Sequence, residues 1–600
     1  MVVGMETVIF GLARVFQMCG EAIGSEFQVV HMPEEAYKVV DVNPRTLWSV
    51  LSGRVSGCRA LRRPSRPAGA SVSAGRSLHL NVPVLTMMPT CWPLTSQPSG
   101  PRWSVPTGSC ADTTSRLPSA AGGVRLCSHL VGEYAEESMK VRFLLVLISA
   151  FAIAAAQSRT PRTMRLDFFH TGDAAGEEFA LDGIVVEGAW PGPLDRWIDD
   201  TNLGSYYFQV VDRSTNRIVF SRGFASIFGE WQTTDEAKQQ RGTFHESVRF
   251  PEPDKPVQIV LKKRGPRNEF REFWSATVDP SAPTVDRSSL PKLNVWAVME
   301  NGAPRDKVDL LLLGDGYTSS EMNKWHSDAR RMADSLFAVS PFKEHRQDFN
   351  IWAIDTPAEE SGVGRPSDGV YRRSPLRAAY DAFGTERYVL TFDNKRLREI
   401  ASAAPYDFME IVVNDQKYGG GGIFNLFATV SAYNAFTPYV FVHEFGHHFA
   451  GLADEYYTSD VAYGSTVERP EPWEPNVTAD SHAAKWKELL GPGIELPSAW
   501  PKQEFEQMEK QIQDRRRAIR AQHRPEEEME ALFREERDRD TKLLSSGPNS
   551  GKVGAFEGAM YEGRGYYRPQ QDCIMFTRDE SGFCAVCRRA IERVIGMYSK

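Results

Sequence analysis

The sequence predicts an α/β domain preceded by an all-β, sandwich-like domain. Residues 166–278 contain short apolar segments separated by Gly, Asn, Asp and Pro, a pattern typical of β-strands and turns. After residue 305, continuous apolar runs alternate with a helical pattern, and strand–helix–strand order is typical of an α/β layer. The 600 residues suffice for two to four domains. We therefore expect a β-rich N-terminal domain at residues 157–285 and a second domain at residues 296–600.

Composition excludes several classes of protein before any motif is considered. The chain is 41% hydrophobic and 25% charged, close to globular averages, which excludes collagen-like and wholly disordered chains. Its net charge of −8 argues against a nucleic-acid-binding protein, which normally has a basic face. We therefore expect no nucleic-acid partner.

The first 138 residues differ from the rest of the chain. Between residues 42 and 111 there is no Asp, Glu or Lys, whereas soluble domains mix both signs of charge. Five of the eight cysteines also lie in this part, namely Cys19, Cys58, Cys91, Cys110 and Cys127. We expect residues 1–138 to be an upstream mistranslation, with a disordered extension as the alternative.

Residues 139–156 have the pattern of a secretory signal peptide. Lys140 and Arg142 precede an apolar run of about a dozen residues, and the three alanines at 154–156 form a cleavage pattern. The apolar run is shorter than the ~20 residues of a transmembrane helix, and no later run is long enough either. We therefore expect a natural start at Met139 and a secreted or periplasmic protein without stable membrane insertion after signal cleavage.

The spacing of apolar residues predicts the main strands. In the first domain the expected strands are Tyr206–Val211, Arg217–Phe220, His245–Phe250 and Pro256–Leu261. In the second domain, continuous apolar runs predict strands covered on both faces at Val308–Leu313, Phe349–Ile354 and Phe408–Val413. The Pro- and Ser-containing residues 279–291 are expected to link the two domains.

The second domain also contains segments with the pattern of helices. Apolar residues recur at helical spacing between Met322 and Leu336, and Thr318 with Glu321 forms a capping-box sequence before them. Residues 503–543 are densely charged and divided by Pro525, which predicts a pair of exposed helices inserted in this domain.

Four glycines at residues 419–422 predict a flexible turn that leads into a further strand, Phe427–Ser431. A phosphate-binding loop is a weak interpretation of the glycines, because no Gly-Lys-Ser/Thr sequence follows them.

One segment carries a candidate metal site. Thr437 can cap a helix whose first residue is Pro438. On such a helix His443 and His447 are four residues apart, so both imidazoles lie on one face and can bind one cation. Imidazole suits Zn²⁺, and three protein ligands with an open fourth position are typical of a catalytic site. Glu444 lies on the neighbouring side of the same turn, where it can act as a general base.

A third ligand is expected shortly after this helix. Gly451 lets the chain leave the helix and brings back Asp454, seven residues after His447. Asp454 is the predicted ligand, with Glu455 as an alternative ligand or a residue that orients the first; a surface acidic pair is the competing interpretation. His448 points away from the other two histidines and is expected to be a packing residue.

The C-terminal segment contains Met575 and three cysteines. A methionine in a tight turn beneath a three-ligand zinc site is typical of metzincins, so we interpret the second domain as a metzincin-like catalytic domain with Met575 in its Met-turn. Residues 583–591 are expected to begin a C-terminal helix. In an exported chain, Cys573, Cys584 and Cys587 are expected to form one disulfide and leave one thiol, with the pairing open.

Together these motifs resemble the IgA-peptidase-type secreted zinc metallopeptidases, a metzincin-like family. The likeness covers nearly the whole chain after residue 156. Beside His443–Tyr457, the segments that carry it are Val308–Tyr317, Lys417–Asn425, Glu474–Thr478, Phe556–Ala559, Gly565–Pro569 and Cys573–Cys587.

The resemblance implies an endopeptidase with one catalytic zinc ion. It implies that His443, His447 and Asp454 bind the zinc, that Glu444 is the catalytic base and that Met575 forms the Met-turn. The spacing differs from the commoner metzincin pattern, because Gly451 and Asp454 stand four and seven residues after the second histidine instead of three and six. The resemblance does not make immunoglobulin the substrate.

The predicted reaction is hydrolysis of a peptide bond in a protein or peptide substrate, by a zinc-bound water that Glu444 deprotonates. The strand Phe427–Ser431 can hold an extended substrate by β-augmentation, and Tyr566 or Tyr567 is a candidate donor to the oxyanion.

Two alternatives compete with this function. The first is a gluzincin-type zinc peptidase whose third ligand is a later glutamate, among residues 526–530. The second is a secreted adhesin or glycan-binding protein with a degenerate peptidase module. The intact Glu444 argues against the second, because an inactive module does not need the base.

Overall fold

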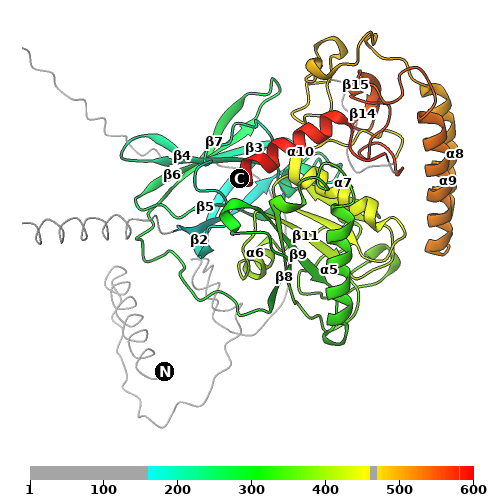
Figure 1. Cartoon of the computed structure of the whole chain (residues 1–600). Helices are drawn as coiled ribbons and strands as arrows, with labels where there is room; N and C mark the ends of the chain where they lie inside the picture. Colours follow the sequence, from blue (N-terminus) through cyan, green and yellow to red (C-terminus); the bar gives the residue numbers. More distant parts are fainter. Residues whose placement is uncertain (1–159, 460–468, 580) are drawn as a thin grey trace, which may run out of the picture. The chain divides into compact units, whose positions relative to one another are not determined.

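The structure, a computed structural model, describes residues 160–459, 469–579 and 581–600 (Figure 1). The extension expected at residues 1–138 and the signal peptide expected at residues 139–156 lie outside the described residues.

The N-terminal part consists of two antiparallel sheets. The first has the strand order β2-β1-β5, with β1 (Arg162–Gly172), β2 (Glu177–Ala189) and β5 (Gly242–Pro251). The second has the order β4-β3-β6-β7, with β3 (Tyr206–Asp212), β4 (Arg217–Phe224), β6 (Val257–Arg264) and β7 (Phe270–Val278). Alternate residues such as Leu166 of β1 and Phe208 of β3 share one buried core, as in a β-sandwich. A short helix, α4 (Ile227–Trp231), lies between β4 and β5 in the chain.

The second part is built on a six-stranded sheet with the order β12-β13-β11-β9-β10-β8. Its strands are β8 (Val295–Met299), β9 (Val308–Asp315), β10 (Phe349–Ile354), β11 (Phe408–Val413), β12 (Gly420–Ile423) and β13 (Phe427–Ser431). The four central strands are parallel to one another, while the edge strands β8 and β12 are antiparallel to their neighbours. The chain is therefore a mixed α/β domain after a β-rich N-terminal region.

Helices cover both faces of this sheet. On one face, Leu310 and Leu312 of β9 pack in one core with α5 (Met322–Leu336), α7 (Thr437–Ala450) and α10 (Ala585–Tyr598). On the other face, Leu311 and Leu313 pack with α6 (Asn394–Ala401). Because both faces are covered, every residue of β9 is buried, which explains its continuous apolar run. The capping box of Thr318 and Glu321 is confirmed, in a 3₁₀ turn directly before α5.

The glycine run differs from its expectation. Gly420–Ile423 is the edge strand β12 and not a flexible turn. A Cβ on Gly420 would lie 2.6 Å from Cγ1 of Val440, and a Cβ on Gly422 would lie 2.9 Å from Cβ of His447 and overlap the backbone of Glu444. The glycines therefore let the strand lie directly on α7, a contact that a hydrophobic pattern does not reveal.

The expectation that Phe427–Ser431 holds an extended substrate is wrong. This segment is β13, which pairs with β11 on one side and with β12 on the other, so neither of its edges is open. The outermost strand on this side of the sheet is β12, and its free edge is bonded at Gly420 to residues 387–389.

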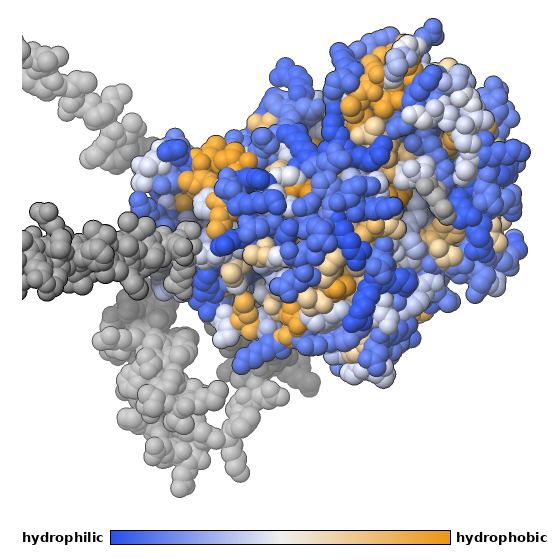
Figure 2. Space-filling view, in the orientation of Figure 1, coloured by the Kyte–Doolittle hydropathy of each residue, from blue (hydrophilic) through white to orange (hydrophobic). Residues whose placement is uncertain are grey.

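The charged segment contains two helices, α8 (Lys502–Ala521) and α9 (Glu526–Leu544), which lie side by side in Figure 1. Figure 2 shows that the face of the molecule around this pair is largely hydrophilic. A hairpin of β14 (Phe556–Ala559) and β15 (Glu562–Arg568) follows. Within the described residues, no helix combines the length and the apolar character that crossing a membrane requires.

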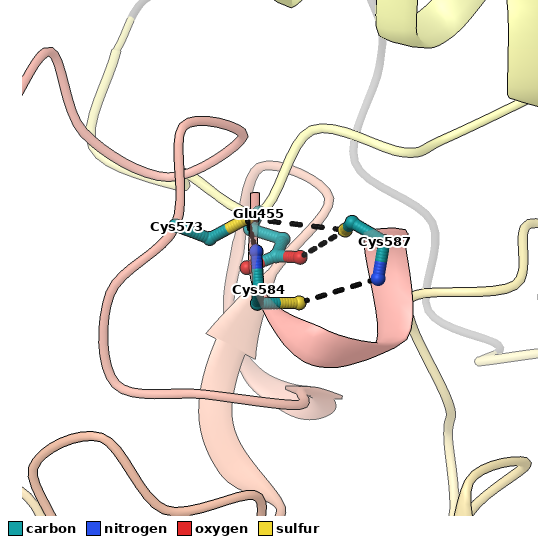
Figure 3. A group of neighbouring side chains, drawn as sticks. All are labelled: Glu455, Cys573, Cys584 and Cys587. Carbon is teal, nitrogen blue, oxygen red and sulfur yellow. Dashed lines mark hydrogen bonds between the residues drawn. The ribbon is translucent and has the colours of Figure 1, made fainter. Parts of the chain in front are cut away.

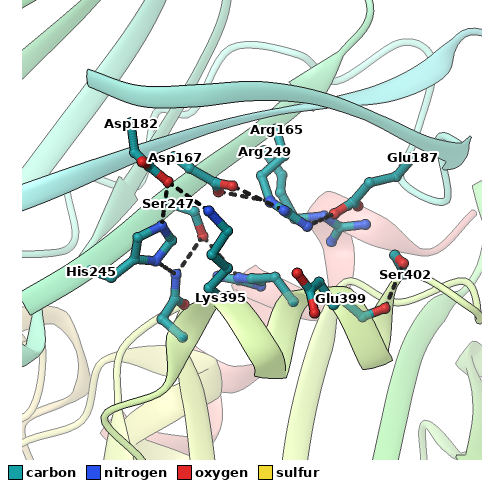
Figure 4. Close-up of polar contacts among 12 residues, drawn as sticks. Arg165, Asp167, Asp182, Glu187, His245, Ser247, Arg249, Lys395, Glu399 and Ser402 are labelled. Atoms are coloured by element: carbon teal, nitrogen blue, oxygen red, sulfur yellow. Dashed lines mark hydrogen bonds and ion pairs between the residues drawn. The ribbon is translucent and has the colours of Figure 1, made fainter. Parts of the chain in front are cut away.

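Charged residues join the β-rich part to α6 (Figure 4). The side chain of Arg249 in β5 lies 3.0 Å from Glu187 and donates to the carbonyl of Tyr406, whose ring centroid is 3.6 Å from the guanidinium carbon. Lys395 of α6 forms a 3.0 Å ion pair with Asp182 of β2. These contacts fix the first N-terminal sheet against the side of the large sheet that α6 covers.

Candidate metal centre

Helix α7 carries both histidines of the motif. It begins at Thr437, but this residue does not cap it: the Thr437 hydroxyl donates to the carbonyl of Ser431 at 2.6 Å. The expected role of Gly451 is confirmed, because this residue ends the helix with a φ of 59° in the left-handed region. A side chain there would also lie 2.7 Å from the ring of Trp473. The chain therefore turns back sharply and returns Asp454 to the helix.

The ligand atoms of His443, His447 and Asp454 form a small triangle. Nε2 of His443 lies 3.0 Å from Oδ1 of Asp454, and Nε2 of His447 lies 3.1 Å from the same oxygen. The two Nε2 atoms are 3.1 Å apart. A cation about 2.0–2.2 Å from each atom, the usual range for zinc with these ligands, fits such a triangle.

The hydrogen bonds of the two rings test whether a cation fits. Nδ1 of His443 lies 2.9 Å from the carbonyl of Ile574, and Nδ1 of His447 lies 2.5 Å from that of Leu452. A carbonyl only accepts, so each Nδ1 carries a hydrogen and each neutral ring directs its Nε2 lone pair at the carboxylate of Asp454. Three acceptors that face one another require a shared cation, so the donor set fits a metal ion.

The pKa shifts of His447 and Asp454 also indicate a site that binds positive charge. Burial alone lowers the pKa of His447, but the adjacent Asp454 outweighs burial and raises that pKa to about 9. Burial alone raises the pKa of Asp454, but His447 and His443 hold it well below its ordinary value. The site therefore attracts positive charge, which a proton or a metal ion can supply.

Tertiary contacts fix the orientation of Asp454. The amide of Asn476 bonds both backbone groups of Ala453, at 2.8 and 2.9 Å. The backbone N–H of Met560 donates to the carbonyl of Asp454 at 3.0 Å, and the hydroxyl of Tyr561 donates to its Oδ2. Asp454 thus keeps Oδ1 for the histidines while Tyr561 binds its other oxygen.

Glu444 lies beside the triangle and lines two adjoining cavities. Within the described residues no side chain donates a hydrogen bond to its carboxylate. Burial raises the pKa of Glu444, while His443 and His447 in their protonated forms, and the charge of Arg387, lower it. A carboxylate with a raised pKa beside a metal site is suited to accept and release a proton.

Met575 packs against α7 next to Gly446. It is fully buried, and its sulfur would lie 3.3 Å from a Cβ on Gly446, which stands between the two histidines in the chain. The residue before it, Ile574, supplies the carbonyl that orients His443. The turn containing Met575 therefore supports the metal-binding face of the helix.

Comparison with known protein families identifies the chain. Residues 296–595 match the family described as IgA Peptidase M64, and residues 156–275 match the family described as Peptidase M64 N-terminus. The chain belongs to the IgA peptidase M64 family. The resemblance inferred from the motifs is thereby confirmed, and membership implies a metallopeptidase that acts on a protein substrate. No curated protein matches the chain.

In this M64 peptidase, several predicted residues lie away from the triangle. The hydroxyl of Tyr566 donates to the carbonyl of Pro470 at 3.2 Å, and neither Tyr566 nor Tyr567 lines the cavities at Glu444, so the structure does not bring these expected oxyanion donors to Glu444. The carboxylate of Glu455 points into a cluster of cysteines, because consecutive side chains leave an extended chain in opposite directions. The structure thus groups Glu455 with the cysteines and not with His443 and His447.

Two of the glutamates proposed as gluzincin-type ligands are bonded to other groups. Glu526 pairs with Arg520 and accepts from the backbone N–H of Tyr418, and Glu530 accepts from the backbone N–H of Ala435. The triangle is completed instead by Asp454. His448 is a packing residue: its Nδ1 lies 3.0 Å from the carbonyl of Ile423, and burial lowers its pKa to about 3.

The structure adds residues that sequence reasoning missed. Arg387 and Tyr456 line both cavities together with Glu444, and Arg387 donates to the hydroxyl of Tyr456 at 3.1 Å. Glu230 of α4 in the N-terminal part also lines one cavity. Tyr456 follows Asp454 by two residues, which is the one sequence signal that could have found it. Arg387 and Glu230 carry no such signal, because only the tertiary fold brings them to the site.

Proposed function

We propose that the chain is an exported zinc-dependent endopeptidase that hydrolyses peptide bonds in protein or peptide substrates. One observation carries the proposal: the ligand atoms of His443, His447 and Asp454 converge within 3.0–3.1 Å of one another, and Glu444 lines the cavity beside them. Two imidazole nitrogens and one carboxylate oxygen suit zinc and leave a coordination position open.

A single zinc ion held by His443, His447 and Asp454 supplies Lewis-acid chemistry, which polarises a scissile carbonyl and makes water more acidic. Glu444 accepts the proton of the attacking water and delivers it to the leaving nitrogen. The hydroxyl of Tyr456 accepts from Arg387, so its own hydrogen is available for the oxygen of the scissile carbonyl. Tyr456 thus replaces Tyr566 and Tyr567 as the candidate oxyanion donor.

The edge strand β12 is the proposed binding site for an extended substrate. The N–H of Gly420 donates to the carbonyl of Arg387 and its carbonyl accepts from Val389, both at 3.1 Å, on the edge that faces away from β13. Backbone groups alternate along a strand, so Gly422 presents its N–H and C=O on this same edge. Gly420 and Gly422 both line the cavity that contains Glu444, so a peptide paired with Gly422 would pass the base.

The catalytic domain is proposed to be metzincin-like. The antiparallel edge strand β12 lies on the helix that carries the histidines, and the turn with Met575 packs against that helix, which supports a Met-turn of the metzincin kind. Export is proposed to depend on residues 139–156. N-terminal sequencing of the secreted protein checks this, because a start well before residue 157 would contradict it.

The catalytic proposal is tested with the purified full chain, casein as substrate and a zinc chelator. The variant Glu444→Gln should reduce cleavage by roughly 10²- to 10⁴-fold, the usual contribution of a general base, and retain its zinc. The matched control is Glu504→Gln, an exposed residue of α8, which should cleave casein at the wild-type rate. Full activity of Glu444→Gln, or activity that persists after the zinc is removed, would show the proposal to be wrong.

A further inference from the structure

A second group of potential metal ligands lies next to the candidate metal centre. It consists of Glu455, Cys573, Cys584 and Cys587, whose ligand atoms all lie within 4.8 Å of one another (Figure 3). All four are buried, with exposed fractions between 0% and 4%. Figure 3 shows the three sulfurs and the carboxylate pointing toward one another from three separate segments of the chain.

We propose that these four residues bind a structural zinc ion. A zinc–sulfur distance of about 2.3 Å and a zinc–oxygen distance of about 2.0 Å in a tetrahedron place two sulfurs about 3.8 Å apart, and a sulfur about 3.5 Å from an oxygen. The sulfurs of Cys573 and Cys587 are 3.8 Å apart, and the sulfur of Cys587 is 3.5 Å from Oε1 of Glu455. These two separations match those of ligands around one tetrahedral zinc ion, and all four ligand atoms lie within 4.8 Å of one another.

The local backbone is arranged to stabilise thiolates. Cys584 caps α10 and Cys587 lies in its first turn, where the helix dipole favours negative charge. The N–H of Cys584 donates to the sulfur of Cys573 at 3.2 Å, and the N–H of Cys587 donates to the sulfur of Cys584 at 3.4 Å. The fully buried Arg568 interacts electrostatically with Glu455 and Cys573, and so offsets part of the negative charge of four anionic ligands.

A disulfide satisfies the cluster less well than a metal ion. The structure has the three cysteines as free thiols, so the disulfide expected from the sequence is not formed, and 3.8 Å is nearly twice the ~2.05 Å of a sulfur–sulfur bond. A disulfide would use two sulfurs and leave the third buried beside a carboxylate. Within the described residues, Oε2 of Glu455 is buried without a hydrogen-bond partner. A cation bound by this carboxylate offsets the cost of burying the unpaired oxygen and uses all three sulfurs.

The site has no open position, since four protein ligands complete a tetrahedron and all are buried. Its role is therefore structural. It joins the loop after α7, the turn with Met575 and the start of α10. Because Glu455 directly follows Asp454, a metal ion here would fix the chain immediately after the third proposed catalytic ligand.

The test measures zinc bound to the purified full chain, without reference to activity. Wild-type protein should hold two zinc ions per chain, Cys584→Ser/Cys587→Ser one, and the control variant His443→Ala/His447→Ala one. Co²⁺ is the spectroscopic probe: thiolate-to-cobalt charge-transfer absorption should appear in the wild type and persist in the histidine variant. The cobalt absorption tests the proposal even if the cysteine variant does not fold, because it is measured on the wild type and the histidine variant.

Three results would overturn the proposal. The first is a disulfide between any two of Cys573, Cys584 and Cys587, found by peptide mapping of unreduced protein. The second is the absence of charge-transfer absorption from cobalt-loaded wild type or histidine variant. The third is an unchanged zinc content in a folded cysteine variant. Loss of zinc from the histidine variant concerns the proposed peptidase site alone, so failure of one site is distinguishable from failure of the other.

Discussion

The backbone N–H of Glu455 donates a hydrogen bond to the carbonyl of Met575 at 2.8 Å. This bond joins the loop that follows α7 to the turn beneath α7. The residue before Glu455 faces the histidines, and the residue before Met575 orients His443. The proposed catalytic site and the cysteine cluster therefore share one short piece of backbone, and a displacement of either loop moves a ligand of both.

Removing the hydroxyl that binds Asp454 should weaken metal binding. In Tyr561→Phe, Oδ2 of Asp454 loses the hydrogen bond that orients the carboxylate, while all three ligands remain. We expect zinc affinity at this site to fall by roughly 10- to 100-fold, the usual effect of removing such a partner. Competition with a chromophoric chelator measures it. The control Tyr371→Phe alters an exposed tyrosine and should bind zinc as the wild type does; equal affinity of both variants would contradict the prediction.

The charge of Arg387 should set the acid limb of the pH–activity profile. Burial raises the pKa of Glu444, and Arg387 is among the positive charges that oppose the rise. The base acts in its ionised form, so activity falls as the pH drops through this pKa. Arg387→Met should therefore move the acid limb of kcat/KM to higher pH with zinc content unchanged.

Arg387→Lys is the matched control for this prediction, because it retains the positive charge and should restore most of the wild-type profile. Superimposable acid limbs for the wild type and Arg387→Met would show that the charge does not act on Glu444.

The contact between β12 and α7 should not tolerate a side chain at Gly422. A Cβ there overlaps the backbone of Glu444 and crowds His447, so Gly422→Ala must displace the strand or the helix. We expect a loss of about 1–3 kcal/mol in the free energy of unfolding and a marked loss of casein cleavage. Gly596→Ala, in α10 with open space around it, is the control and should be neutral or slightly stabilising. Wild-type cleavage by Gly422→Ala would refute the close packing.

Much of the sheet could be predicted from the sequence because its strands are buried on both faces. The apolar runs Phe349–Ile354, Phe408–Val413 and Phe427–Ser431 coincide with the bounds of β10, β11 and β13. The edge strand β12 could not be predicted in this way, since glycine has neither a hydrophobic pattern nor a preference for strands.

The residues of the site likewise include some that the sequence predicts and others that only the fold reveals. The histidines and Glu444 are close in sequence, so helical spacing alone predicts that they share a face. Tyr561 stands 107 residues after Asp454 and reaches it only through the fold of the β14–β15 hairpin. The cluster of Glu455 with the cysteines has the same cause, because Glu455 and Cys587 are 132 residues apart. Contacts of this kind follow from the assembled domain and not from local patterns.

The capping box before α5 should make stability depend on acid pH. Burial alone raises the pKa of Glu321, but hydrogen bonds from Thr318, Ser361 and Asn414 outweigh it and lower that pKa from 4.5 to about 2. A lowered pKa contributes stability fully above pH 4.5, and the contribution is lost as the pH falls toward 2. Glu321→Gln should therefore reduce the free energy of unfolding by about 1 kcal/mol at pH 7, the difference between charged and neutral hydrogen bonds.

Urea denaturation between pH 3 and pH 7 measures this effect. The difference between wild type and Glu321→Gln should shrink below pH 4.5, because acid protonates Glu321 and removes the charge that the variant already lacks. Glu359→Gln, an exposed position in the same part of the chain, is the matched control and should differ from the wild type by less than about 0.5 kcal/mol throughout. A difference for Glu321→Gln that stays constant with pH would mean that the charge of Glu321 does not stabilise the start of α5.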